Sequence, residues 1–260
     1  MSVNKVKKAN VYSIEGTEKG SMEVPAIFLS NIRSDIINKI VKVMESNARV
    51  PYGADKLAGM KHSVEWAGKG RGVARTPRLM DSLTGAQAPN TVGGREAHPP
   101  KSEKNYKRKI NKKEMKIGFT SALSASADID KIRARGHIME KELTLPIVVE
   151  EAIESVNSTK EAKKILLALG LWNDVLKSKK RKKERAGKGK IRGRRLKRRR
   201  GILVVVSSGS RALGFNNLDG VEVKSIKEIN VSDLAPGGMP GRLTIYSKNA
   251  MSVITEVRPL

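Results

Sequence analysis

The stretch that decides the fold is Ile202-Leu203-Val204-Val205-Val206. It is apolar throughout and mostly β-branched, which is typical of a strand buried on both faces in the middle of a parallel sheet. Further short apolar segments predict strands at 145–149, 221–225 and 243–246. Helical patterns lie between or after these strands, at 162–169, near Arg211, at 231–235 and at 248–257. This alternation predicts an α/β fold with a four-stranded, mostly parallel sheet and flanking helices on both faces.

Upstream of this region the patterns are more varied. Residues 11–14 and 21–24 flank a turn that contains glycine, and they predict a short hairpin. A helix is expected to begin near Ser34, because Ile36, Ile37, Ile40, Val41 and Met44 recur at helical spacing. Residues 111–135 also predict a helix, which opens with a capping box of Asn111 and Glu114. A second capping box, of Ser158 and Glu161, precedes the helix at 162–169, and Gly170 is a suitable end for that helix.

These patterns divide the chain into five segments. The expected divisions are an N-terminal hairpin and helix (1–45), an extended loop rich in Gly, Pro and Arg (46–104), helices with the first core strand (105–176), a basic insertion (177–200) and the rest of the α/β core (201–260).

The segment 46–104, called here the glycine-rich segment, shows no apolar periodicity of either kind. It holds five of the ten prolines in the chain together with scattered basic residues. So long a loop without regular structure is usually either functional or disordered, and a plain linker is the alternative interpretation. Its varied composition favours a chain that folds on a partner. The candidate RNA-binding residues are Tyr52, His62, Trp66, Lys69, Arg71, Arg75, Arg78, Arg95, His98 and Lys101.

The basic run, residues 177–200, contains sixteen Lys or Arg and one Glu, and so carries +15 of the formal charge of +26. A block this dense repels itself until an anion neutralises it, and nucleic-acid phosphates do so with release of counterions. A solvated tail or a localisation signal is the alternative, but such a signal needs only about 5–8 basic residues. The run falls in a crossover, where it can extend outward without disturbing the core. Its candidate RNA-binding residues are Lys179, Lys180, Arg181, Lys182, Lys183, Arg185, Lys188, Lys190, Arg192, Arg194, Arg195, Lys197, Arg198, Arg199 and Arg200.

Several other functions find no support in the sequence. Cysteine is absent, which excludes disulfides and thiolate metal sites and fits a reducing cytosol. There is no apolar stretch of about 20 residues and no signal-peptide core, so a soluble intracellular protein is expected, without a membrane partner. The glycines at 68, 70 and 72 fail the dinucleotide fingerprint, because Val73 stands at its sixth position. The three histidines are too far apart for a metal motif, and we expect them at the surface or facing RNA. Glu150, Glu151 and Glu154 are expected in a helix cap or on a solvated face, so neither an enzyme nor a cofactor is predicted.

Specific motifs in the middle of the chain resemble the fourth large-subunit ribosomal protein family, in its archaeal and eukaryotic type. The resemblance runs in order along nearly the whole chain. The motifs are HSVEW (62–66), GRGVARTPR (70–78), GAQAPN (85–90), GGREAHPPK (93–101), RGH (135–137), ALGL (168–171), LAPGG (234–238) and PGRLTI (240–245). One departure is Ala67, where many relatives have a second aromatic residue beside Trp66.

The resemblance implies a structural constituent of the large ribosomal subunit that binds and organises its rRNA in the cytoplasm. It further implies that the α/β body lies on the outside of the subunit and that the glycine-rich segment threads through rRNA to the peptide exit tunnel. Neighbouring ribosomal proteins and the nascent peptide are then partners. The alternatives are a free RNA-binding assembly or regulatory factor, which should show a modular RNA reader, and an enzyme, which needs functional groups at the carboxyl ends of its strands.

Overall fold

The computed structural model describes residues 8–207 and 212–254, and these fall into two units. One unit comprises residues 1–45 and 109–260, called the body below, and the second unit is Ser46–Arg108. The expected helical segment at Arg211 and the expected helix end at 255–257 lie outside the described residues.

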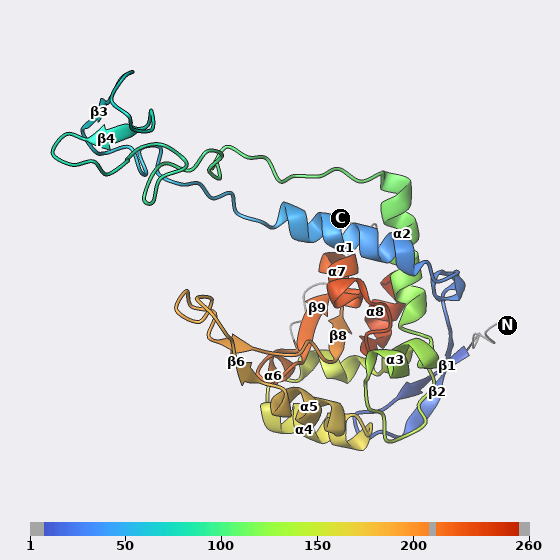
Figure 1. Cartoon of the computed structure of the whole chain (residues 1–260). Coiled ribbons are helices and arrows are strands. Elements are labelled where there is room, and N and C mark those ends of the chain that lie inside the picture. Colours follow the sequence, from blue (N-terminus) through green and yellow to red (C-terminus); the bar gives the residue numbers. More distant parts are fainter. Residues whose placement is uncertain (1–7, 208–211, 255–260) are drawn as a thin grey trace. The chain divides into compact units, whose positions relative to one another are not determined.

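The body is built on a mixed α/β arrangement with a mostly parallel central sheet (Figure 1). Its strand order is β2-β1-β5-β10-β8-β9. All neighbours in this order run parallel except β1 and β2, which are antiparallel. The strands are β1 (Lys8–Tyr12), β2 (Glu18–Glu23), β5 (Ile147–Val149), β8 (Leu203–Val206), β9 (Glu222–Ser225) and β10 (Thr244–Ser247).

The sheet is buried on both faces, as the apolar stretch at 202–206 predicts. Leu203 and Val205 point into one apolar cluster, while Val204 and Val206 point into the other. This alternation follows from the two-residue period of a strand. Val204 is fully buried and pairs with Ile245 of β10 and Val223 of β9. The stretch therefore forms an interior strand of the sheet.

Helices supply the apolar residues that cover each face. The first cluster contains residues of η1 (Ala26–Leu29), α1 (Ser34–Asn47), α2 (Lys112–Ala125), η3 (Ile226–Glu228), α7 (Val231–Leu234) and α8 (Lys248–Val253). The second contains residues of α3 (Ile129–Arg135), η2 (Glu151–Ser155), α4 (Thr159–Ala168), α5 (Trp172–Lys180) and α6 (Leu213–Asn216). A short turn of helix, η4 (Pro236–Gly238), follows α7.

The sheet has six strands where the sequence predicts four, because the N-terminal hairpin joins it. Ala9 and Val11 of β1 face one cluster and Tyr12 faces the other, so β1 is buried on both faces and pairs with β5. The outer strand β2 is mostly exposed and carries charged side chains. Charged residues on an edge strand discourage pairing with other chains.

Two local predictions need correction. The segment 111–135 forms two helices, because Asp128 caps a new helix by accepting a hydrogen bond from the Asp130 amide. Ser158 stands at the N-cap of α4, but its side chain makes no capping hydrogen bond. A capping box does form at α7, between Asn230 and Asp233.

The second unit contains little regular structure. It has one small antiparallel pair, β3 (Val64–Trp66) with β4 (Pro77–Leu79). Pro77 and Ala86 are the only buried residues in the second unit, which the structure describes throughout. Apolar packing therefore contributes little to its conformation.

Candidate nucleic-acid interface

Polar contacts join the two limbs of the second unit where it begins and ends. The Asn47 side chain accepts a hydrogen bond from the Arg108 amide at 2.7 Å and donates to the Arg108 carbonyl at 3.2 Å. Ser46 Oγ donates to the Tyr106 carbonyl at 2.8 Å, and the Arg49 guanidinium lies 4.5 Å from the Tyr106 ring centroid. The Asn47 side-chain amide thus both accepts from and donates to the backbone of the opposite limb, as a neighbouring strand would.

Further along, glycines allow the backbone to approach itself closely. Gly59 has φ +74°, and a Cβ there would lie 2.5 Å from the Gly94 carbonyl carbon. A Cβ on Gly94 would lie 2.0 Å from the Ala88 oxygen. Such distances exclude any side chain, so Gly59 is required by the packing of one limb on the other and Gly94 by a tight turn within its own limb.

The end of this unit is an open, basic turn between β3 and β4. Gly68, Gly70 and Gly72 all have positive φ, and nothing lies within 4 Å of a Cβ added to any of them. These glycines are therefore required by backbone conformation alone, whereas Gly59 combines a positive φ with a close neighbour. Lys69 and Arg71 lie between these glycines and Arg75 follows them, and all three basic residues are exposed. The turn thus presents basic side chains on a backbone that can be approached from several sides.

The other predicted residues of the glycine-rich segment have different surroundings. Tyr52 and Trp66 are 59% and 64% exposed, which leaves their rings available for stacking. Tyr52, His98 and Lys101 line one shallow hollow. His62 and Arg95 are exposed, and the His62 carbonyl accepts a hydrogen bond from Gln87.

Arg78 differs from the other basic residues of this segment. Its guanidinium donates to the Leu83 and Ala74 carbonyls and so holds the turn from within. Much of its hydrogen-bonding capacity is therefore used inside the second unit.

The basic run of the body leaves α5 and forms a small hairpin. Its strands are β6 (Lys183–Glu184) and β7 (Leu196–Lys197), and the Arg185 amide donates to the Arg195 carbonyl at 2.8 Å. Four of its basic residues have carboxylate partners: Lys182 with Asp219, Arg195 with Glu184, Arg199 with Asp174 and Arg200 with Glu222. Every candidate residue of the run is exposed except Arg199.

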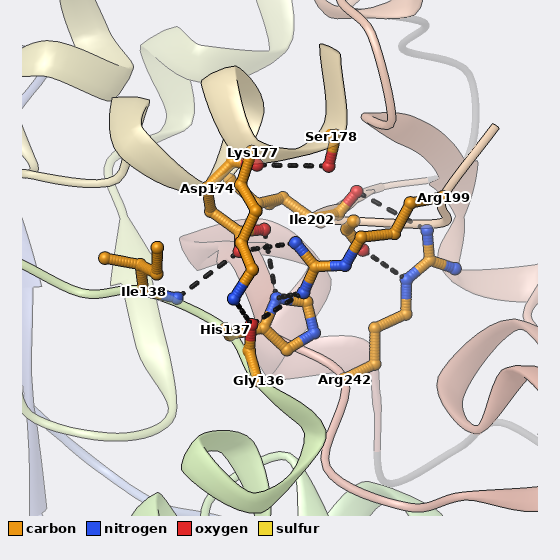
Figure 2. A network of polar contacts seen from close by, with 10 residues as sticks. Gly136, His137, Ile138, Asp174, Lys177, Ser178, Arg199, Ile202 and Arg242 are labelled. Carbon is orange, nitrogen blue, oxygen red and sulfur yellow. Dashed lines mark hydrogen bonds and ion pairs between the residues drawn. The ribbon is translucent and has the colours of Figure 1, made fainter. Parts of the chain in front are cut away.

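Arg199 belongs to a buried polar network at the root of this hairpin (Figure 2). It donates to Asp174 Oδ1 at 3.0 Å and to the Gly136 carbonyl at 2.9 Å. Lys177 donates to the same carbonyl at 2.8 Å. The run was expected to extend outward from the core, but the guanidinium of Arg199 is anchored in the body.

His137 is also buried, contrary to the expectation of a surface or RNA-facing residue. Its Nδ1 lies 3.0 Å from Asp174 Oδ2, and both side chains are fully buried. Burial lowers the pKa of His137, and the neighbouring Asp174 only partly opposes this. Burial alone would raise the pKa of Asp174, but its contacts with His137 and Arg199 outweigh burial and lower it. At neutral pH His137 is uncharged, so Arg199 is the ionic partner of Asp174.

Arg242 is the largest fully buried side chain of the described residues. It donates to the Gly201 carbonyl at 2.7 Å, to the Asp233 carbonyl at 2.7 Å and to Glu222 at 2.8 Å. Burial lowers its pKa, while Glu222 raises it in part. Sequence reasoning noted Arg242 only as part of a motif, and its place directly before an apolar strand is the signal that could have identified it.

The carboxylates near the strand ends serve the fold. Glu154 accepts hydrogen bonds from the Ser207 amide at 2.9 Å and from the Ser207 hydroxyl at 2.7 Å, and it also contacts the Ser247 hydroxyl. It thereby links the carboxyl ends of β8 and β10. Glu150 accepts from the Ile14 amide and pairs with Lys19. Glu154 was expected to cap a helix or to lie on a solvated face, and it does neither.

In residues 8–207 and 212–254, no group of three or more His, Asp or Glu side chains is placed to hold a metal ion. Within the same ranges, no helix has the length and apolar character needed to cross a membrane.

The fold and the exposed basic residues define a class of protein. It is a strongly basic α/β protein whose charge is concentrated in segments outside its core, and this distribution of charge suits the binding of a polyphosphate.

The sequence profile of the Ribosomal protein L4/L1 family matches residues 22–257. The chain is 45% identical over 249 residues to large ribosomal subunit protein uL4 of Pyrobaculum aerophilum, covering 94% of this chain and 88% of that protein. The chain is 41% identical to uL4 of Archaeoglobus fulgidus, in a match that covers 96% of this chain and 98% of that protein. It is 40% identical to uL4 of Halorubrum lacusprofundi, in a match that covers 95% of this chain and 99% of that protein. The chain belongs to the ribosomal protein L4/L1 family.

Proposed function

We propose that this chain is a structural constituent of the large ribosomal subunit, where it binds and organises large-subunit rRNA in the cytoplasm. Family membership and the match to ribosomal relatives along nearly the whole chain support this function over a free assembly or regulatory factor. The family is one of structural proteins, so no catalytic role is assigned to the chain. Neighbouring proteins of the subunit are its further partners.

The observation that carries the proposal is the composition of the second unit. Two of its residues are buried, while Val50, Leu57 and Val92 are large, apolar and more than half exposed. Exposed apolar and aromatic side chains among arginines suit splayed bases and phosphates better than water. A segment with so little core of its own gains its remaining order from the molecule it binds.

We further propose that the extended glycine-rich segment threads through rRNA and that its turn at 66–78 lines the nascent-peptide exit tunnel. Lys69, Arg71 and Arg75 then face phosphates or the tunnel lumen. The open glycines between them support this arrangement, because they allow RNA to approach the backbone. The nascent peptide becomes a partner on this view.

Charge reversal at two positions tests the threaded arrangement. Large subunits are assembled with Arg71→Glu or Arg95→Glu and probed by hydroxyl-radical footprinting of the rRNA. Both substitutions change the charge equally, and both residues are exposed. A threaded turn predicts that Arg71→Glu removes rRNA protection near the tunnel, whereas Arg95→Glu removes it where the segment docks.

Charge steering alone predicts the same small, uniform effect from both variants. Equal loss of protection, or no loss, would therefore reject the threaded arrangement while leaving rRNA binding intact. Failure of the wild-type chain to enter the subunit would reject the proposed function itself.

A further inference from the structure

The root of the basic hairpin forms an open hollow of about 390 Å³ whose lining residues are all basic. Lys180 and Arg181 come from the end of α5, Lys183 from β6, and the remainder from β7 and the residues after it. The lining residues are Lys180, Arg181, Lys183, Lys197, Arg198 and Arg199. Among the described residues, only Arg199 of these six has a carboxylate partner. The site is thus strongly positive, and only one of its six charges is neutralised by a carboxylate among the described residues.

Backbone contacts fix the positions of the lining residues. The Arg181 amide donates to the Lys177 carbonyl at 3.1 Å and so ends α5 in a regular way. Lys183 and Lys197 are register partners across the β6–β7 pair. Arg199 is held by Asp174 and by the Gly136 carbonyl. The backbone of these residues and the Arg199 side chain are therefore in place before any ligand arrives.

The pairing of Lys183 with Lys197 is the observation that points to an anion. Like charges directly opposite each other on neighbouring strands destabilise a pair of strands. An anion between them converts this repulsion into attraction. The carboxyl end of α5 opposes an anion, but its partial charge is only about half a unit, against the positive charges of the five lining residues other than Arg199.

We propose that this hollow binds one backbone phosphate of large-subunit rRNA and thereby fixes the hairpin of the basic run. The inference rests on the proposed function and adds a specific site to it. Arg199 contributes from the floor with its position set by Asp174, while Lys183, Lys197 and Arg198 contribute from the hairpin. Basic residues toward the hairpin end, such as Lys190 and Arg192, then act mainly through summed charge.

Two matched double variants of the full chain test the site. Lys197→Ala/Arg198→Ala removes one Lys and one Arg from the hollow, and Lys190→Ala/Arg192→Ala removes the same pair of residue types outside it. Binding to a large-subunit rRNA transcript is measured by filter retention at several KCl concentrations. We expect the hollow variant to bind about tenfold or more weakly than the control variant, because it loses charge-assisted hydrogen bonds to a fixed phosphate.

Three further measurements separate position from charge and from folding. The melting temperature of the free hollow variant should not fall, because the substitution removes the Lys183–Lys197 repulsion. Asp174→Asn raises the net charge by one yet should weaken binding, because it releases Arg199. Replacing KCl by phosphate at equal ionic strength should not remove the difference between the two double variants.

These measurements distinguish the phosphate site, its assignment to rRNA and the proposed function. Equal weakening in both double variants would overturn the phosphate site, while a steep salt dependence in the wild type would keep the proposed function. Loss of the difference in phosphate buffer would overturn the rRNA assignment in favour of a free anion. Absence of rRNA binding by the wild-type chain would overturn the proposed function as well.

Discussion

Arg242→Met should destabilise the body by about 3 kcal/mol. The guanidinium makes two 2.7 Å hydrogen bonds to the backbone carbonyls of Gly201 and Asp233. A hydrogen bond from a charged donor contributes roughly 1.5–3 kcal/mol, so the two together contribute roughly 3–6 kcal/mol. Methionine also avoids the cost of burying a charge, and this offsets part of the lost stability. The net loss is therefore expected near the lower end of that range.

The ion pair with Glu222 adds little to this figure. The Glu222 side chain is one-third exposed, so water screens its attraction to Arg242 and solvates it once the arginine is gone. The loss of stability should therefore come from the two carbonyls. Arg242→Lys retains the charge, but a single ammonium cannot reproduce the planar donors of a guanidinium. The Arg242→Lys variant should therefore lose about as much stability as Arg242→Met.

Urea unfolding of the full chain, followed by circular dichroism, measures the effect. Domains are stable by about 5–15 kcal/mol, so a loss of this size should shift the midpoint clearly. Arg33→Met is the matched control, because Arg33 pairs with Asp35 at the exposed surface and its loss should leave the midpoint unchanged. A loss below about 1 kcal/mol for Arg242→Met, or full stability in Arg242→Lys, would refute the assignment of the stability to these hydrogen bonds.

Three further outcomes are expected. Val204→Asp should cost several kcal/mol, because it buries an unpaired charge in the sheet, and an unchanged circular-dichroism melt would contradict the sheet position. His137 has a folded-state pKa below its ordinary 6.5, so the unfolded chain binds more protons and stability should fall as pH drops below about 6.5, by at most about 1.4 kcal/mol per pH unit. Urea midpoints at pH 7 and 5.5 should therefore differ less in His137→Gln than in the wild type. Replacing residues 46–104 by a short linker should leave the body's melting temperature nearly unchanged, and a large drop would show that the segment supports the body.

The strands of the body were predictable where their residues are mostly apolar. Residues 202–206 and 243–246 mark β8 and β10 because both faces of these strands are covered. The N-terminal hairpin was predicted as a hairpin, but its place in the sheet was not. That place depends on the pairing of Val11 with Val148, a contact between distant parts of the chain that no local pattern encodes.

The network at the hairpin root was not predictable for a related reason. Nothing in a run of sixteen basic residues marks Arg199 as the one that reaches a buried carboxylate. The available signal was Asp174, an acidic residue next to Val175 on the buried side of α5. By contrast, the irregular character of the second unit follows directly from its lack of apolar periodicity, because without a periodic stripe there is no face to bury.

The Gly136 carbonyl has a consequence for how this chain can change in evolution. It accepts hydrogen bonds from both Lys177 and Arg199, residues that lie at the two ends of the basic run. The run therefore leaves and re-enters the body at nearly one point. The entropic cost of closing a loop grows only slowly with its length, by about 0.6 kcal/mol for each doubling. Residues between these two anchors can be gained or lost with little effect on the body, so the length of the hairpin is free to follow the RNA that it meets.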